Sequence, residues 1–265
     1  MILTLLLILF LLMVVVGGNR GVDSFFALVG TMFALLIEVY LIAWGLPAIF
    51  VTLMVSIAIV LIVLYVQNGV NTKMHASAIS VCVTIFFVMI TAGPILWSAG
   101  ISGYNEIEQY EEISMYLSAD LDISMSAIVL SAVVLGLLGA VMDTAVAITT
   151  AINEVYINKP DMTEKQLFQS GLLIGKDILG TTINTLFFAG LGECIMLSVL
   201  FVKNEDTFAS ILNSKALFQE VSGLLVGAIG CLLVIPLSSF CMAALLTRFP
   251  EKVVTGDESE EENVD

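Results

Sequence analysis

The sequence predicts an all-α, polytopic integral membrane protein with about seven transmembrane helices. Of its 265 residues, 59% are hydrophobic and 12% are charged, whereas an average soluble domain has about 25% charged residues. A soluble fold of this size would need a larger polar shell, so the composition argues against a cytosolic enzyme, and we expect no enzymatic activity. Nine Lys and Arg against 24 Asp and Glu also argue against a nucleic-acid partner, whose phosphates require a basic surface.

Seven apolar stretches are long enough to cross a bilayer, because a membrane helix needs about 20 mostly apolar residues. The first stretch lacks the basic flank of a signal peptide, so we interpret it as a spanning helix. Trp44 and Pro47 mark a tight turn after the second stretch, and Trp97 ends the fourth at an interface. The predicted spans are 2–18, 24–44, 47–66, 76–97, 124–156, 166–202 and 221–247.

The fifth and sixth stretches are longer than one crossing requires. A helix over 124–156 would reach about 50 Å, compared with a hydrocarbon core of about 30 Å. We expect its excess to project into the cytoplasm or to be taken up by tilt. The sixth stretch should be one long helix, or a helix that breaks near 177 or is discontinuous. This expectation rests on its glycines, which are Gly171, Gly175, Gly180, Gly190 and Gly192.

The distribution of basic residues predicts that the N-terminus is outside and the C-terminus inside. Lys and Arg are retained on the cytoplasmic side of membrane proteins. In this orientation seven of the nine basic residues fall on inner segments, and only Lys203 and Lys215 fall on outer ones. The inner residues are Arg20, Lys73, Lys159, Lys165, Lys176, Arg248 and Lys252.

This topology divides the chain into four regions. Residues 1–97 form an N-terminal four-helix membrane region, and 124–247 form a membrane core of three helices. The acidic segment 98–123 between them is expected outside, with a short amphipathic helix lying on the membrane surface. Residues 248–265 form an acidic cytoplasmic tail that is expected to be disordered.

Three carboxylates are predicted to lie inside the membrane, where an ionisable residue costs about 2.5–3.5 kcal/mol at a helix centre. Glu38 is expected in the outer half of the second span, Asp143 near the centre of the fifth, and Glu193 in the outer half of the sixth. No Lys or Arg is expected in the central bilayer to neutralise them. These groups must therefore be protonated, hydrated in a cavity or paired with a mobile cation.

Small residues and Asp143 recur every three or four positions in the fifth span and therefore share one helix face. Such residues allow a second helix to approach closely, so the carboxylate should point at a neighbouring helix. We expect this face to dock on the sixth span, with Asp143 opposite Thr181 and Asn184. The face comprises Gly136, Gly139, Ala140, Asp143, Ala147, Ala151 and Glu154, and the opposing face comprises Asp177, Thr181, Asn184 and Phe188.

Two interpretations of Asp143 remain open. In the first, its carboxyl group hydrogen-bonds Asn184 or a hydroxyl and only fixes helix packing. In the second, Asp143 carries a proton or binds a cation, and Thr181 and Asn184 supply neutral oxygens or orient a substrate. Lys176 and Asp177 would then form an inner gate. Glu38 and Glu193 are further candidates for this pathway, although both could instead reach the outer headgroup region.

The cysteines and the histidine do not form a recognisable metal or redox centre. The four cysteines lie inside apolar runs without a C-x-x-C pair or a histidine at zinc spacing, so we expect them to be packing residues. His75 follows Lys73 in a short polar link and is expected to be a solvated loop residue. We therefore expect no cofactor, and the sequence leaves the presence of a metal undetermined.

The runs LLGAVMDTAVAITTAINE (137–154) and GLLIGKDILGTTINTLFFAGLGE (171–193) resemble the YibE/F-like bacterial membrane proteins. The resemblance covers about 126–247, and the first four spans only by hydropathy. No large extracytoplasmic domain precedes the first span, so the chain resembles a short, F-type member. The shared features are Met142-Asp143, Asn153-Glu154, the Gly-Lys-Asp of 175–177, Gly180-Thr181 and Asn184-Thr185-Leu186.

The resemblance implies a multi-pass protein of the bacterial plasma membrane. Such proteins are described as uncharacterised or as permeases, so the resemblance agrees with a role in transport but implies no reaction and no substrate. We therefore predict a small permease or transporter subunit that moves a solute or ion, with a proton- or cation-binding carboxylate in the bilayer. The alternative is a non-transport membrane interaction protein, either a surface receptor or a subunit that binds a larger YibE-like protein. Besides the lipid bilayer, the expected partners are therefore a YibE-like membrane protein or a second copy of the chain.

Overall fold

The computed structural model describes residues 1–98, 124–203 and 207–248. Every regular element in these ranges is helical, and six helices are long and apolar enough to cross a membrane. The all-α class and the multi-pass membrane character are therefore confirmed. The elements are α1 (Ile2–Ala43), α2 (Ala48–Leu61), the π-helix η1 (Ile62–Val66), α3 (Thr72–Ser98), α5 (Met125–Asn158), α6 (Glu164–Lys203), α7 (Phe208–Leu212) and α8 (Lys215–Arg248).

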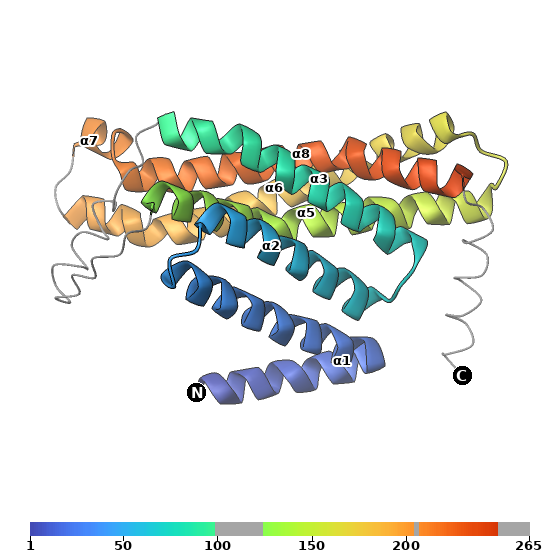
Figure 1. The fold of residues 1–265 in the computed structure, drawn as a ribbon, viewed down its shortest axis with the longest axis horizontal. Coiled ribbons are helices and arrows are strands. Elements are labelled where there is room, and N and C mark those ends of the chain that lie inside the picture. Colours follow the sequence, from blue (N-terminus) through green and yellow to red (C-terminus); the bar gives the residue numbers. More distant parts are fainter. Residues whose placement is uncertain (99–123, 204–206, 249–265) are drawn as a thin grey trace.

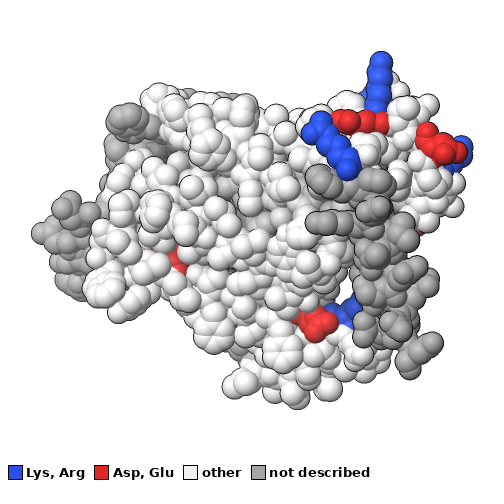
Figure 2. Space-filling model, turned by 45° about the vertical axis from the view of Figure 1, so that its right-hand side comes forward, with Lys and Arg blue, Asp and Glu red and all other residues white. Residues whose placement is uncertain are grey.

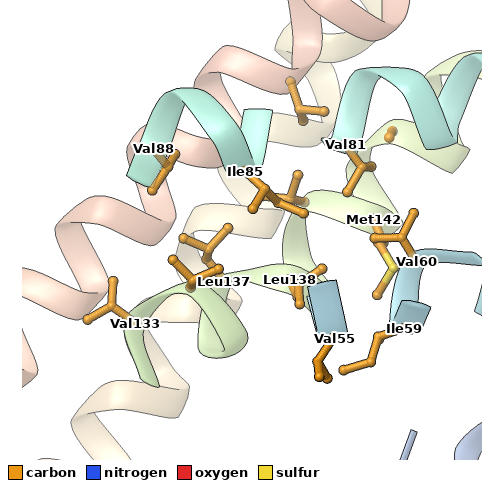
Figure 3. Close-up of a cluster of buried hydrophobic side chains, with 14 of the residues drawn as sticks. Val55, Ile59, Val60, Val81, Ile85, Val88, Val133, Leu137, Leu138 and Met142 are labelled. Atoms are coloured by element: carbon orange, nitrogen blue, oxygen red, sulfur yellow. The ribbon is translucent and has the colours of Figure 1, made fainter. Parts of the chain in front are cut away.

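Helices α5 and α8 form the centre of an elongated bundle (Figure 1). Helices α3 and α6 each pack against both of them, α2 packs on α5 and α3, and α1 packs on α2 and η1. Apolar side chains from α2, α3 and α5 converge in the main core (Figure 3), which also includes α8. A second core joins α5, α6 and α8 through Ile148, Ile152, Leu167 and Met242. These cores fix α5, α6 and α8, the helices that carry most of the predicted polar residues.

Helix α1 folds back on itself, so the first two predicted spans form one element with two arms (Figure 1). At the bend, Gly18 has φ 56° and ψ −135°, a conformation that residues with a side chain rarely adopt. Gly21 then lies against the backbone carbonyl of Met13, where a Cβ atom would clash. Phe10 and Phe25 pack across the arms with ring centroids 4.7 Å apart. The first arm reaches about 24 Å, less than the hydrocarbon thickness of about 30 Å, so a seventh crossing stays a prediction.

Helix α6 is one continuous helix of 40 residues, so of the two predicted alternatives the long helix is observed and the broken one is wrong. Three of its glycines are used for close packing instead: a Cβ atom on Gly171, Gly175 or Gly190 would clash with side chains of α5 or α8. The packing gained by this close approach outweighs the weak helix propensity of glycine, about 1 kcal/mol per residue relative to alanine. The helix reaches about 60 Å, so its ends extend beyond the hydrocarbon core.

Helix α8 begins at Lys215, well before the predicted start of the seventh span at 221. The Ser214 hydroxyl accepts a hydrogen bond from the backbone N–H of Leu217 at 3.2 Å and so caps the helix. The first turns of α8 contain Gln219 and Glu220 and are too polar to appear in a hydropathy pattern. The short helix α7 was not predicted, and Thr207 caps it by accepting from the Ser210 N–H.

The helices alternate in direction, which gathers the predicted inner links at one end of the bundle (Figure 1). That end contains the bend of α1, the α2–α3 link, the α5–α6 link and the end of α8, and Lys203 and Lys215 lie at the other end. Figure 2 shows most charged side chains of the visible face toward one end, and only a small acidic spot on the broad surface elsewhere. Successive links therefore lie at alternate ends of the bundle, and most basic residues lie at one end, as the predicted topology requires. The assignment of the basic end to the cytoplasm remains a prediction.

Several predictions concern residues that are not described. The amphipathic surface helix within 98–123 and the acidic tail of 248–265 lie almost entirely outside the described residues, as does Lys252. The division into four regions therefore remains a prediction at these two segments.

Candidate functional site

The predicted small-residue face of α5 lies on the surface of the described chain. Gly136, Gly139, Asp143 and Ala147 are exposed, and Ala140 is half-buried. No described atom of another helix lies within 4 Å of the place that a Cβ atom would take on Gly136 or Gly139. The predicted close helix contact at these positions is therefore wrong within this chain. Helix α5 instead buries its bulkier face, which removes more apolar area from lipid and water and includes Val134, Leu138, Val141 and Ile148.

The polar face of α6 is exposed as well, at Asp177, Thr181, Asn184 and Phe188. The Thr181 hydroxyl donates to the Ile178 carbonyl of its own helix at 2.8 Å. Among the described residues, no hydrogen bond joins Asp143 to Thr181 or Asn184. The interpretation of Asp143 as a packing group held by Asn184 therefore finds no contact within this chain.

Asp143 nevertheless lies at the same height in the bundle as Gly180 and Thr181. Helices α5 and α6 run antiparallel, and contacts near each end of their shared seam fix their register. Interpolation between these contacts places Asp143 level with Gly180 and Thr181, and Asn184 about one turn away. At one end, Gly171 of α6 lies against Ile152 of α5. At the other end, Leu137 of α5 and Leu186 of α6 both lie against Gly227 of α8.

Two pockets lie along the α5–α6 seam, one on each side of Asp143. The first, of about 330 Å³, is lined by α5, α6 and α8 and includes Gly136, Gln219 and Glu220. The second, of about 430 Å³, lies at the link between α5 and α6 and includes Glu154. Gly136, Asp143 and Glu154 belong to one face of α5, so this face runs from one pocket to the other.

The proposed inner gate has no direct contact to support it. Lys176 and Asp177 are both exposed, and in the described part of the chain neither forms an ion pair. Adjacent residues on a helix point about 100° apart and do not face each other. Any gating role would therefore require a group outside α6.

Glu38 differs from these exposed residues because its side chain is 2% exposed. The Oγ1 atom of Thr52 lies 2.7 Å from Glu38 Oε1 and 2.6 Å from Ser131 Oγ. These hydrogen bonds join α1, α2 and α5 through one buried polar chain. The alternative in which Glu38 reaches the outer headgroups is wrong, because the carboxyl group points into the protein.

The two hydroxyl residues of this polar chain, Thr52 and Ser131, were missed by the sequence analysis, as was Ser56, which lies one helical turn from Thr52 on α2. Thr52, Ser56 and Ser131 are all buried. Thr52 and Ser56 are one helical turn apart on α2, so a hydroxyl pair at i and i+4 in an otherwise apolar span was the available signal. Within the described residues, neither Glu38 Oε2 nor Ser56 Oγ has a hydrogen-bond partner. This buried polar cluster is named the Glu38 cluster below.

Glu193 lies on α6, but its side chain is outside the part of the structure that is described. Its predicted role in the pathway therefore remains a prediction.

A sequence model of the YibE/F-like protein family matches residues 5–248. The match includes the N-terminal helices α1, α2 and α3 as well as the region 126–247 on which the resemblance rests. No curated protein and no solved structure shows a match to the chain.

Proposed function

The chain belongs to the YibE/F-like protein family, and we propose that it is a permease or transporter subunit of the bacterial plasma membrane. In this proposal it moves a solute or ion along the α5–α6 face and performs no covalent chemistry. Asp143 takes up a proton or a cation during each transfer. Thr181 and Asn184, on the neighbouring face of α6, offer neutral oxygens to the moving species.

The observation that carries this proposal is the position of Asp143. The residue lies near the middle of the apolar helix α5, is exposed, and has a pocket on either side of it along the same seam. A carboxylate at this depth is costly in hydrocarbon. Since no basic side chain among the described residues pairs with it, water or a mobile cation is the group that can stabilise its charge.

The proposed pathway begins and ends at polar groups. The pocket at one end contains Gln219 and Glu220, and the pocket at the other end contains Glu154 and Lys159. Between them the α5 side of the pathway carries small residues, which leave room for a hydrated species. Lys176 and Asp177 lie on α6 between Thr181 and the basic end, where an inner gate would be needed.

One observation favours the second candidate function, a membrane interaction protein. Gly136, Gly139 and Gly180 all stand open, with no described atom within 4 Å of a Cβ position. Small residues at this spacing are typical of surfaces on which a second membrane helix docks. A YibE-like partner or a second copy of the chain would then cover Asp143 and hydrogen-bond its carboxyl group.

Cysteine labelling separates the two functions. In a variant in which the four native cysteines are replaced by alanine, Asp143→Cys should react with a small charged methanethiosulfonate, because only a thiol in contact with water ionises and reacts. The matched control is Phe86→Cys, an exposed position on the apolar surface of α3, which should remain unmodified. Failure of both positions to react in the folded protein would overturn a hydrated pathway at Asp143 and leave the interaction function.

A further inference from the structure

We propose that the Glu38 cluster is a binding site for a monovalent alkali cation, sodium, which is separate from the α5–α6 pathway. Its ligands are the carboxylate of Glu38 and the hydroxyl oxygens of Thr52, Ser56 and Ser131. Ser131 and Asp143 are twelve residues apart on α5, which corresponds to about 18 Å along the helix. The two sites can therefore be tested independently, and this proposal does not depend on transport at Asp143.

The chemistry of the cluster suits a hard cation with one positive charge. All its candidate ligands are oxygen atoms, which hard cations prefer over nitrogen or sulfur. A buried carboxyl group must be protonated or have a compensating charge, and no basic side chain among the described residues pairs with Glu38. One carboxylate balances one positive charge. The described residues also contain no group of three or more His, Cys, Asp and Glu that would hold a divalent or transition metal.

The hydrogen bonds of the cluster leave ligand positions open. Ser131 Oγ donates its own proton to the Ala127 carbonyl at 2.9 Å. The single hydroxyl proton of Thr52 can be donated to Glu38 or to Ser131, but not to both. Glu38 Oε2 and Ser56 Oγ are buried and form no hydrogen bond with each other or with any other described atom. A proton on Oε1 can be donated to Thr52 Oγ1, but it leaves Oε2 and Ser56 Oγ without partners. A cation between the two oxygens would bind both of them. It would also explain why they do not bond to each other, because two ligands on opposite sides of an ion are too far apart for a hydrogen bond.

A pocket lies near the cluster at one end of the bundle. It measures about 290 Å³ and lies at the turn between α1 and α2, beside the start of α5. Ala48 and Ala127 line this pocket. Each is four residues before a ligand, Thr52 on α2 and Ser131 on α5, and therefore lies one helical turn away on the same face. The pocket thus ends one turn from the proposed ligands, and small alanine side chains occupy the intervening positions.

The test measures sodium-dependent stability of the purified full chain in lipid nanodiscs. The melting temperature is recorded against sodium chloride at constant ionic strength, with choline chloride as the replacement salt. A cation that binds only the folded protein raises the melting temperature as its concentration passes Kd. We expect this rise in the wild type and its loss in Glu38→Gln. We expect Ser56→Ala to raise the apparent Kd for sodium by about tenfold or more.

Ser56→Ala is the decisive variant, because Ser56 Oγ has no hydrogen-bond partner among the described residues. If the Ser56 hydroxyl had only a structural role, removing it would leave the sodium response unchanged. Ser238→Ala is the matched control, since this buried hydroxyl of α8 donates only to the backbone of its own helix. It should keep the full sodium response.

Three results would overturn the proposal. The first is a wild-type melting temperature that does not respond to sodium, or that rises equally with choline. The second is an unchanged sodium response in Ser56→Ala, which decides the question even where Glu38→Gln fails to fold. The third is loss of the response in Asp143→Asn together with its retention in Ser56→Ala, which would assign sodium binding to the α5–α6 face.

Discussion

Replacing Gly171 by alanine should force α6 away from α5 and α8, whereas the same change at Gly139 should be tolerated. A Cβ atom on Gly171 would lie 2.5 Å from Ser239 Oγ, 2.6 Å from Ile152 Cδ1 and 2.8 Å from Ser239 Cβ. The Ile152 methyl group can rotate away, but Ser239 Cβ is fixed by its backbone. Relief of that contact therefore requires the helices to separate. Gly139 has no described atom within 4 Å of its Cβ position.

The expected magnitude follows from comparing the two variants. Overpacking of a well-filled contact costs about 1–3 kcal/mol. Exchange of glycine for alanine within a helix contributes about 1 kcal/mol of stabilisation. Because that gain is common to Gly171→Ala and Gly139→Ala, it cancels in their difference. The two variants should therefore differ by about 1–3 kcal/mol in the free energy of unfolding, with Gly171→Ala the less stable.

The assay is thermal or denaturant unfolding of both variants in the same lipid nanodisc, beside the wild type. A double variant that adds Ile152→Val to Gly171→Ala should recover part of the loss, because it removes one of the three clashing atoms. Equal stability of Gly171→Ala and Gly139→Ala would refute the continuous, closely packed α6. It would also remove the register that places Asp143 level with Thr181 along the bundle.

The remaining predictions concern topology, the Glu38 cluster and the open face of α5. On a cysteine-free background, an impermeant thiol reagent added outside intact cells should label cysteines placed within 105–120 and spare Lys73→Cys; the reverse pattern would invert the orientation. Thr52→Val removes the hydroxyl that contacts both Glu38 and Ser131, so it should lower unfolding stability by about 1–3 kcal/mol in a denaturation assay. A change below a few tenths would show that the cluster contributes little to stability. Gly139→Leu should leave the fold of the isolated chain intact, but it should dissociate any complex on this face in cross-linking experiments; an unchanged complex would exclude docking there.

The membrane fold could be predicted from the sequence because the length and apolarity of a span are local properties. Most predicted boundaries lie within a few residues of the observed helices, as for the span 47–66, which is Ala48–Val66 in the structure. The errors arise where distant contacts decide. Gly171 and Gly175 weaken a helix locally, yet in the fold they allow α6 to approach α5 and α8. At Gly18, in contrast, the bend between the two arms of α1 agrees with the predicted end of the first span at residue 18.

The candidate site was harder to predict because the same pattern of small residues occurs both on faces that pack against a helix of the same chain and on faces that remain open. The spacing of Gly136, Gly139 and Asp143 correctly grouped them on one face, but spacing alone does not tell whether that face meets a helix of the same chain. Glu38 was identified from its charge within an apolar span. Its burial depends on Thr52 and Ser131, which approach it only when α1, α2 and α5 assemble. Hydropathy treats these hydroxyls as neutral and does not identify them.

The most direct test of the proposed transport function is ion flux in liposomes that contain the purified chain. Proton and alkali-cation fluxes would be recorded under an imposed gradient for the wild type, Asp143→Asn and Asp143→Glu. Asp143→Asn keeps the size and the hydrogen-bonding capacity of the side chain but removes its charge and its titratable proton. The proposal predicts flux in the wild type, none in Asp143→Asn at equal incorporation and stability, and partial flux in Asp143→Glu. Absence of wild-type flux for protons and alkali cations, or an undiminished flux in Asp143→Asn, would contradict it.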